Sequence, residues 1–250
     1  MNWQNRYLQQ AAWTRKLRTY LFKKAGFSSA RCVLEVGCGS GAILREASLP
    51  EDELPTRAAL YGVDLAAAAL SECRIHAPGS SLTRADALCL PYSDKTFDIS
   101  YCHFLLLWVN DPLQALSEMK RVTRSQGHVL ALAEPDYTSR VDRPREIAWL
   151  GRQQTESLER QGADVSIGSR LADLFYQAGI LILETGEIKS LDKGALTYKE
   201  WENEWEVLEV DLAGMVTKEE MQGMKRLDEQ AWRRGEHILN VPTYFAWGQV

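Results

Sequence analysis

Long apolar runs, paired cysteines and an excess of basic residues are all missing from this 250-residue sequence. No stretch approaches the roughly 18 consecutive apolar residues that a membrane-spanning helix needs. The polar N-terminal segment has no signal-peptide core, so we expect a cytoplasmic protein without membrane insertion. The net charge of −5 disfavours a nucleic-acid partner, because nucleic-acid-binding proteins usually carry a basic face.

The five cysteines are scattered, and none shows a CxxC or cysteine–histidine spacing typical of a metal site. An odd number of cysteines within mostly apolar runs is typical of reduced, buried thiols. We therefore predict no metal. The sequence does not indicate an oligomeric state.

Short apolar runs alternate with helical patterns from residue 32 onwards, after a helical segment over residues 1–30. Parallel strands covered on both faces read as continuous apolar runs. The pattern predicts a single α/β domain over 31–250, with a Rossmann-like doubly wound sheet of about seven strands. Residues 136–178 and 196–240 read as helical additions, and a helix from Pro112 is expected to end at Gly127.

The stretch RCVLEVGCGSGAILREA places glycines at alternate positions where a strand turns into a helix. Such a loop lets a ligand touch the backbone, and two ligands exploit it: a dinucleotide pyrophosphate and S-adenosylmethionine. Glu35 lies two residues before Gly37, where it would repel a pyrophosphate and suit a cationic amine. Asp64 ends the next strand, where a carboxylate accepts ribose hydroxyls or caps the following helix.

Four segments in order carry a resemblance to a known family: LEVGCGSG, YGVDL, ADALCLPYSDKTFD and EMKRVTRSQGHVLA. Over roughly Cys32–Pro135 the chain resembles class I S-adenosylmethionine-dependent methyltransferases, in the small-molecule branch of the ubiquinone/menaquinone-type C-methyltransferases. The resemblance implies S-adenosylmethionine as cofactor. It also implies a seventh, antiparallel strand, which TYFAWGQV near the C-terminus would supply.

The resemblance also assigns roles to residues at the cofactor. It implies backbone contacts to the methionine end from Gly37, Cys38 and Gly39, a contact of Glu35 with the amino group, Asp64 at the ribose, Leu65, Asp86 and Ala87 at the adenine, and Cys102 and His103 near the sulfonium. The N-terminal helix closes over the carboxylate in this family, and the candidates there are Arg15 and its neighbours Tyr7, Trp13, Thr14 and Arg18.

Methyl transfer from a sulfonium depends largely on alignment, and a base is needed only if the acceptor must lose a proton. His103 is the candidate base, with a packing role as the alternative. Glu134, Asp136 and Tyr137 follow the fifth strand and are candidates to touch the acceptor.

The Asn/Asp-Pro-Pro-aromatic tetrad of base-methylating enzymes is absent after the fourth strand, which favours a small-molecule acceptor. An aromatic stripe that includes Trp201 and Trp205 either lines the acceptor site or packs its helix onto the protein. Three other functions stay open: methylation of protein or tRNA, cofactor binding without catalysis, and nicotinamide-dependent oxidoreduction.

Overall fold

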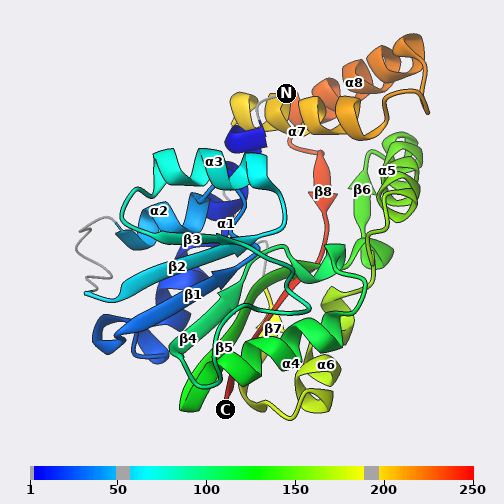
Figure 1. The fold of residues 1–250 in the computed structure, drawn as a ribbon. Helices are drawn as coiled ribbons and strands as arrows, with labels where there is room; N and C mark the ends of the chain where they lie inside the picture. Colours follow the sequence, from blue (N-terminus) through cyan, green and yellow to red (C-terminus); the bar gives the residue numbers. More distant parts are fainter. Residues whose placement is uncertain (1–2, 49–56, 189–196) are drawn as a thin grey trace.

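The computed structural model describes the backbone of residues 3–48, 57–188 and 197–250, and the side chains of 11–47, 57–188 and 197–250 (Figure 1). The candidate Tyr7 lies outside the described side chains. No helix in these ranges is long and apolar enough to cross a membrane.

A seven-stranded sheet forms the centre of the molecule, in the order β3-β2-β1-β4-β5-β9-β7. The strands from β1 to β5 run parallel to one another, whereas β9 is antiparallel to both of its neighbours and leaves β7 at the edge. The predicted fold class is thereby confirmed. The strand bounds are Cys32–Val36 (β1), Ala59–Asp64 (β2), Ser81–Arg84 (β3), Phe97–Cys102 (β4), Thr123–Pro135 (β5), Leu181–Glu187 (β7) and Thr243–Gln249 (β9).

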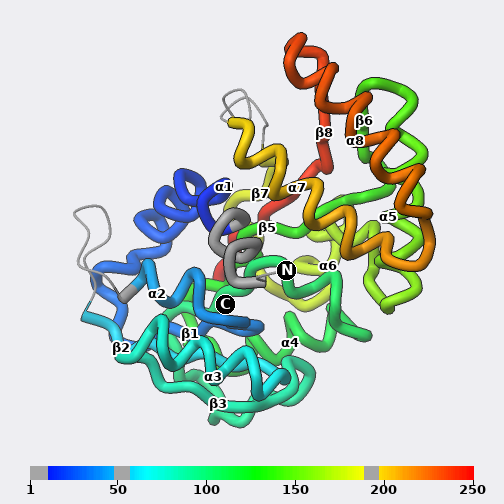
Figure 2. Tube along the Cα trace, turned by 90° about the horizontal axis from the view of Figure 1, so that it is seen from above, coloured from blue at the N-terminus to red at the C-terminus, as the bar shows by residue number. Residues whose placement is uncertain are grey.

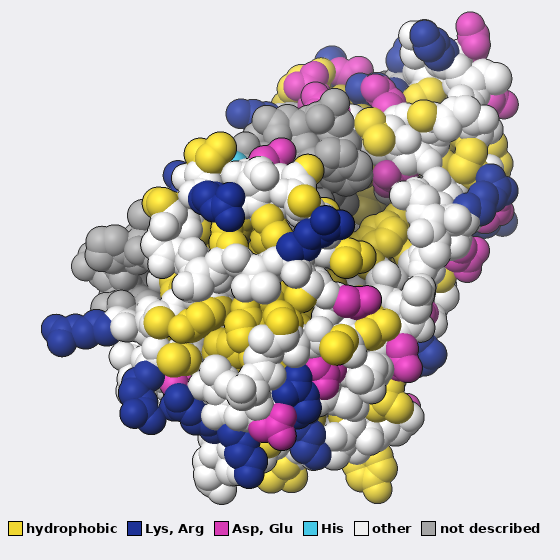
Figure 3. Space-filling model, viewed as in Figure 1, with side chains coloured by type: hydrophobic (Ala, Val, Ile, Leu, Met, Phe, Trp, Pro, Cys, Tyr) yellow, Lys and Arg dark blue, Asp and Glu magenta, His cyan; other side chains and the backbone are white. Residues whose placement is uncertain are grey.

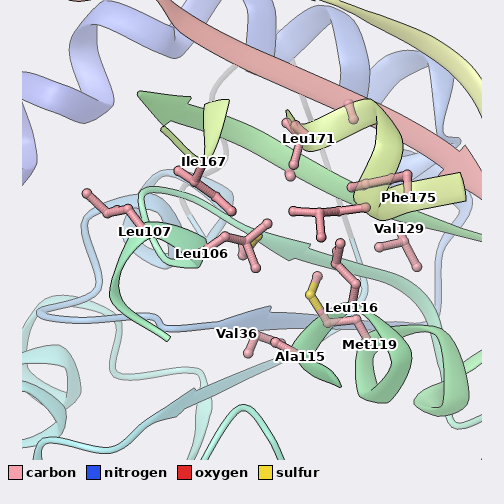
Figure 4. Packing of buried hydrophobic residues seen from close by; sticks show 14 of the residues in the cluster. Val36, Leu106, Leu107, Ala115, Leu116, Met119, Val129, Ile167, Leu171 and Phe175 are labelled. Carbon is pink, nitrogen blue, oxygen red and sulfur yellow. The ribbon is translucent and has the colours of Figure 1, made fainter. Parts of the chain in front are cut away.

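Helices cover both faces of this sheet because its strands are apolar on both sides. One face carries α1 (Trp3–Lys24), α2 (Ala42–Ser48) and α3 (Ala67–His76), and the other carries α4 (Pro112–Val122) and α6 (Leu171–Gln177). Figure 4 shows side chains of α4 and α6 meeting the sheet and the loop after β4 in one apolar cluster.

The helix α4 begins as predicted and ends earlier than predicted. The Asp111 side chain accepts from the Gln114 N–H at 2.9 Å, which caps the helix. The chain then enters β5 at Thr123, which pairs with Phe97, instead of continuing to Gly127. Gly127 serves a different purpose: a Cβ at this position would lie 2.7 Å from the Asp98 carbonyl oxygen, so the close strand approach requires glycine.

The additions after β5 combine helices with a small second sheet. A short strand, β6 (Val141–Arg143), interrupts the segment that the sequence predicted as helix, and it pairs with β8 (Ile238–Asn240). The helices α5 (Ala148–Arg160), α7 (Tyr198–Asp211) and α8 (Lys218–Arg233) lie side by side beyond one end of the main sheet (Figure 2). We call these three helices the helical unit.

Candidate active site

A cleft of about 600 Å³ opens where β1, β2 and β4 end, the usual ligand position in a parallel sheet. We call its two parts the loop end and the helix end, which meet at residues 103–105. The loop end consists of residues 35–40, 42–43, 63–65 and 85–88. The helix end consists of residues 107–110, Tyr137, Leu158, Gln161, Val207 and Asp211. Figure 3 shows hydrophobic side chains gathered across the middle of this side of the molecule.

Three glycines of the loop after β1 have a positive φ: Gly37 at 73°, Gly39 at 50° and Gly41 at 84°. A Cβ on Gly37 would lie 2.6 Å from Leu105 Cδ1, so a side chain here would clash with the wall of the cleft. The N–H groups of Gly37 and Cys38 donate to the Val63 carbonyl at 2.8 and 2.9 Å. These two N–H groups are therefore already paired. What the loop offers a ligand is close approach to its backbone.

Glu35 is a buried carboxyl group at the base of the loop end, only 2% exposed. Burial raises its pKa well above the usual range, although the Tyr101 hydroxyl donates to it at 3.1 Å and Arg18 lies near enough to act in the opposite direction. A cation in the cleft would replace the water that this carboxyl group has lost. The geometry therefore fits the predicted ammonium partner.

Asp64 fixes the loop and stays in reach of the cleft. Its Oδ2 accepts from the Gly39 N–H and its Oδ1 from the Ala66 N–H, both at 2.8 Å. A carboxylate oxygen has two lone pairs, so each can also accept a ligand hydroxyl. The ribose role and the capping role are thus compatible. Beside it, Leu65 lines the cleft with 62% of its surface exposed, so its side chain is open to contact with a flat ring.

The loop after β3 completes the loop end. Asp86 is exposed and accepts from the Leu88 N–H at 2.9 Å through Oδ1, and Ala87 lines the cleft beside it. Ser40, which the sequence analysis did not single out, is 2% exposed, and its Oγ has no hydrogen-bond partner. Because a buried hydroxyl group normally has a partner, Ser40 also indicates that the loop end is shaped for a polar ligand.

His103 lies where the two ends of the cleft meet. Its Nε2 is 2.9 Å from the Thr14 Oγ1, which accepts from Arg18 Nη1 at 2.7 Å, and Arg18 also forms an ion pair with Glu46. Loss of solvation on burial and the charge of Arg18 lower the pKa of His103 to about 3. His103 is therefore neutral near pH 7 and a weak base.

Arg15, the candidate carried forward from the N-terminal helix, is exposed and lies outside the described lining of the cleft. Thr14 and Arg18 are 3% exposed and occupy the inward face of α1, on the same side as Ala11. The helix thus directs Thr14 and Arg18 toward His103, and Arg15 toward solvent.

Glu134 shapes the cleft wall from behind. It is fully buried and accepts from the N–H groups of Leu105, Leu106 and Leu107 at 3.0 to 3.3 Å. Burial raises its pKa to about 7, against the effect of these donors. Cys102 is also fully buried, with its Sγ 3.9 Å from Glu134, so neither residue reaches the described lining of the cleft.

The residues after β5 divide between support and lining. Asp136 accepts from the Thr138 N–H at 2.9 Å and is 2% exposed, so it holds the turn rather than facing a ligand. Tyr137 lines the helix end, and its contact with the acceptor stays a prediction. No group of three or more His, Cys, Asp or Glu side chains in the described part of the chain is placed to hold a metal ion.

Trp201 and Trp205 lie inside the helical unit, away from the described lining of the cleft. They are 1% and 2% exposed, and their indole N–H groups both donate to Asp228 Oδ2, at 2.8 and 2.7 Å. His237 Nδ1 is 2.7 Å from the other Asp228 oxygen. These contacts fit the packing alternative for the aromatic stripe. α7 reaches the cleft through Val207 and Asp211 instead.

A family model described as a methyltransferase domain matches residues 34–131. An uncharacterized protein of transposon TN4556 from Streptomyces fradiae is 30% identical over 198 residues, 76% of this chain and 55% of that protein. The ubiquinone/menaquinone biosynthesis C-methyltransferase of Bdellovibrio bacteriovorus is 34% identical over 128 residues, 48% of this chain and 49% of that protein. The chain thus spans about half the length of these curated relatives.

Solved structures show the same fold at low identity. Geranyl diphosphate methyltransferase in complex with S-adenosylmethionine aligns with a TM-score of 0.59 at 12% identity, over 92% of this chain and 82% of that one. The cyclase SpnF aligns with a TM-score of 0.59 at 18% identity, over 94% and 80%. With the matched segment, the strand order and the glycine loop between Glu35 and Asp64, the chain contains a class I S-adenosylmethionine-dependent methyltransferase domain.

Proposed function

We propose that this chain transfers a methyl group from S-adenosylmethionine to a small-molecule acceptor held at the helix end of the cleft. The observation that carries the proposal is the single cleft in which the loop end and an apolar helix end meet at His103, Phe104 and Leu105. Methyl transfer needs both reactants aligned in one cavity, because the gain comes from orientation.

At the loop end, each predicted residue has a task toward the cofactor. Glu35 in its ionised form attracts the amino group, and Asp64 accepts from the ribose hydroxyls. Leu65 covers the adenine, Asp86 accepts from its amine, and Ser40 gains the hydrogen-bond partner that its buried hydroxyl lacks. When bound, the cofactor supplies an activated methyl group on a positively charged sulfur.

Alignment rather than proton transfer is the proposed source of rate enhancement. A group with a pKa of about 3 removes protons poorly at neutral pH, so His103 positions the reactants and shields them from water. Thr14 and Arg18 hold its ring in place through the contacts described above.

The additions to the sheet act as a cover in this proposal. The segments 136–178 and 196–240 contribute Tyr137, Leu158 and Val207 to the helix end, and the N-terminal segment 1–30 contributes the Thr14 contact with His103. An apolar wall of this kind excludes water and favours an acceptor with an apolar body.

A transfer assay with S-adenosylmethionine labelled in the methyl group tests the proposal. The protein is incubated with small-molecule, peptide and RNA fractions of a cell extract, and the product is identified by its mass. We expect label in a small molecule, and loss of that label with Asp64→Ala. Label only in peptide or RNA would overturn the acceptor class, and no transfer by a protein that binds the cofactor would support a non-catalytic role.

A further inference from the structure

Phe104 has a backbone conformation that an aromatic residue rarely adopts. Its φ is 52°, in the left-handed region where a bulky side chain crowds the backbone. Two other non-glycine residues of the described chain have a positive φ, Lys95 and Gln126, and both are exposed and outside the cleft lining. Phe104 instead lines the cleft where its two ends meet. Backbone strain that is kept at a ligand site indicates a use for the side chain.

The end of β5 imposes this conformation on Phe104. The Phe104 N–H donates to the Ala133 carbonyl at 2.9 Å, and the next three N–H groups donate to the Glu134 carboxyl group at 3.0 to 3.3 Å. Two neighbouring residues of β5 thus hold four consecutive N–H groups. A turn fixed in this way cannot relax around a bulky side chain, whereas asparagine or glycine would fit the same backbone with less strain. The turn itself therefore does not explain why the residue is phenylalanine.

The ring of Phe104 combines fixed packing with contact to the cleft. It is half-buried and packs partly against the apolar cluster between the sheet, α4 and α6. The His103 ring meets it at a right angle, with the ring centroids 4.8 Å apart and the planes at 88°. Because the pKa of His103 is lowered to about 3, this neighbour carries no charge near pH 7. The orientation of the Phe104 ring is thus set before a ligand binds, which lowers the cost of binding.

The junction of the cleft is lined by uncharged side chains. Its described lining residues are His103, Phe104 and Leu105, whereas Glu35 and Asp64 belong to the loop end. In the proposed function, the methyl group passes from a cofactor at the loop end to an acceptor at the helix end. The positively charged sulfur that carries this methyl group must therefore lie near the junction. A cation over the face of an aromatic ring is attracted by the electron distribution of the ring, and Phe104 offers such a face.

We infer that Phe104 recognises the sulfonium charge and thereby favours S-adenosylmethionine over S-adenosylhomocysteine, the product of the transfer. The inference rests on the proposed function and deepens it by naming a specificity-determining residue for the cofactor. During the transfer, the bond between sulfur and the methyl carbon breaks, its electron pair stays on sulfur, and a new bond joins the methyl carbon to the acceptor. The positive charge leaves with the methyl group, so the ring loses its attraction for the sulfur and the product is released more easily.

A comparison of three ligands tests the inference without knowledge of the acceptor. S-adenosylmethionine and S-adenosylhomocysteine differ only in the methyl group and its charge, so their shared contacts with the loop end cancel in the ratio of their dissociation constants. Sinefungin has an ammonium group in place of the methylated sulfur, so it keeps a charge there without the methyl group on sulfur. Titration calorimetry at pH 7 measures all three dissociation constants for the full chain and its variants.

Variants of Phe104 separate the ring from the apolar bulk of the side chain. Phe104→Leu keeps an apolar side chain without a ring, and we expect it to lower the preference for S-adenosylmethionine over S-adenosylhomocysteine by about fivefold, the scale of a cation–ring contact. Sinefungin should weaken together with S-adenosylmethionine. Phe104→Tyr keeps the ring and should keep the preference within about twofold of the wild type.

Two further variants complete the experiment. Phe104→Asn also lacks the ring and tolerates a left-handed backbone, so it replaces Phe104→Leu if the leucine variant fails to fold, and the same loss of preference is expected. Tyr176→Leu is the matched control, because it removes an aromatic side chain that is 80% exposed and outside the described lining of the cleft. It should bind all three ligands as the wild type does.

The outcomes separate this inference from the proposed function. An unchanged preference in Phe104→Leu or Phe104→Asn, in a protein that keeps wild-type affinity for S-adenosylhomocysteine, would overturn the inference and leave the proposed function standing. Weaker binding of S-adenosylmethionine with unchanged binding of sinefungin would also overturn it, because the ring would then contact the methyl group and not the charge. If the wild type binds neither S-adenosylmethionine nor S-adenosylhomocysteine, the proposed function itself fails.

Discussion

The cleft and the helical unit each contain a deeply buried carboxyl group, and the two groups differ in their partners. Asp228 in the helical unit accepts from two indole N–H groups on one oxygen and contacts His237 with the other. Glu35 in the cleft accepts from the Tyr101 hydroxyl and from the backbone of Leu44, and the Oγ of Ser40 nearby has no hydrogen-bond partner. Asp228 therefore has its partners inside the protein, whereas Glu35 lies on the lining of a cleft, where a ligand can reach it.

Trp205→Ala should break the helical unit and spare the cleft, and it carries the largest expected effect. Removing a buried indole leaves a cavity and takes one donor from Asp228, so we expect a loss of about 3–5 kcal/mol in the free energy of unfolding. Denaturant unfolding measures it. Tyr176→Ala, at a side chain 80% exposed, is the control and should cost little. Weakened cofactor binding with unchanged stability would reverse the assignment of the two regions.

The buried carboxyl group of Glu134, behind the wall of the cleft, should make the free energy of unfolding depend on pH. Burial raises the pKa of Glu134 to about 7, from an ordinary 4.5. A raised carboxyl pKa means that stability is fully present below the ordinary value and is lost as pH rises through 7. Relative to Glu134→Gln, the wild type should therefore lose about 3 kcal/mol between pH 4.5 and 7 or above.

Glu118→Gln provides the opposite sign as a control for this experiment. The hydrogen bond from Arg121 lowers the pKa of Glu118, so its contribution is lost as pH falls rather than as it rises. Unfolding curves of wild type and Glu134→Gln that run parallel from pH 4.5 to 8 would show that the three backbone donors to Glu134 outweigh its burial.

Asp64→Ala should weaken S-adenosylmethionine binding by about 1.5–3 kcal/mol, the scale of losing charge-assisted hydrogen bonds. Titration calorimetry measures the change. Asp111→Ala is a matched control, because Asp111 also accepts from the backbone near the start of a helix but does not line the described cleft. Equal affinities in the two variants would remove Asp64 from the ribose site.

His103→Ala carries the smallest expected effect within the cleft. Because its pKa of about 3 makes the histidine a weak base, we expect the rate of methyl transfer to fall by less than about tenfold. Single-turnover rates of the wild type and of His103→Ala should depend on pH in the same way between pH 5 and 9. A loss of about 10²–10⁴-fold would restore His103 as a general base.

The sheet and the loop end of the cleft could largely be predicted, because their residues lie in short contiguous segments of the sequence. Glu35, the glycines and Asp64 follow consecutive parallel strands, and the carboxyl ends of such strands meet at one edge. Their positions in the sequence therefore predict their positions in the cleft, although the sequence does not show that Asp64 already holds the Gly39 N–H.

The helix end could not be predicted in the same way, because it is assembled from side chains of separate helices. The stripe of Trp201 and Trp205 predicts a buried helix face but not which neighbour covers it, and α8 supplies that neighbour through Asp228. In the sequence, Asp211 resembles the other acidic residues of its helix, and only the structure shows that Gln154 donates to its side chain. Arg15 and Arg18 differ only in the helix face on which they lie, and α1 turns Arg18 inward.

A side-by-side titration of S-adenosylmethionine and NADH into the wild-type protein tests the central claim most directly, since both ligands suit a glycine loop after a strand. The carboxyl groups of Asp64 and Asp86 in the lining of the loop end predict that S-adenosylmethionine binds in one-to-one ratio and that NADH, with its pyrophosphate, does not compete. Binding of NADH, with S-adenosylmethionine failing to bind or to displace it, would contradict the account.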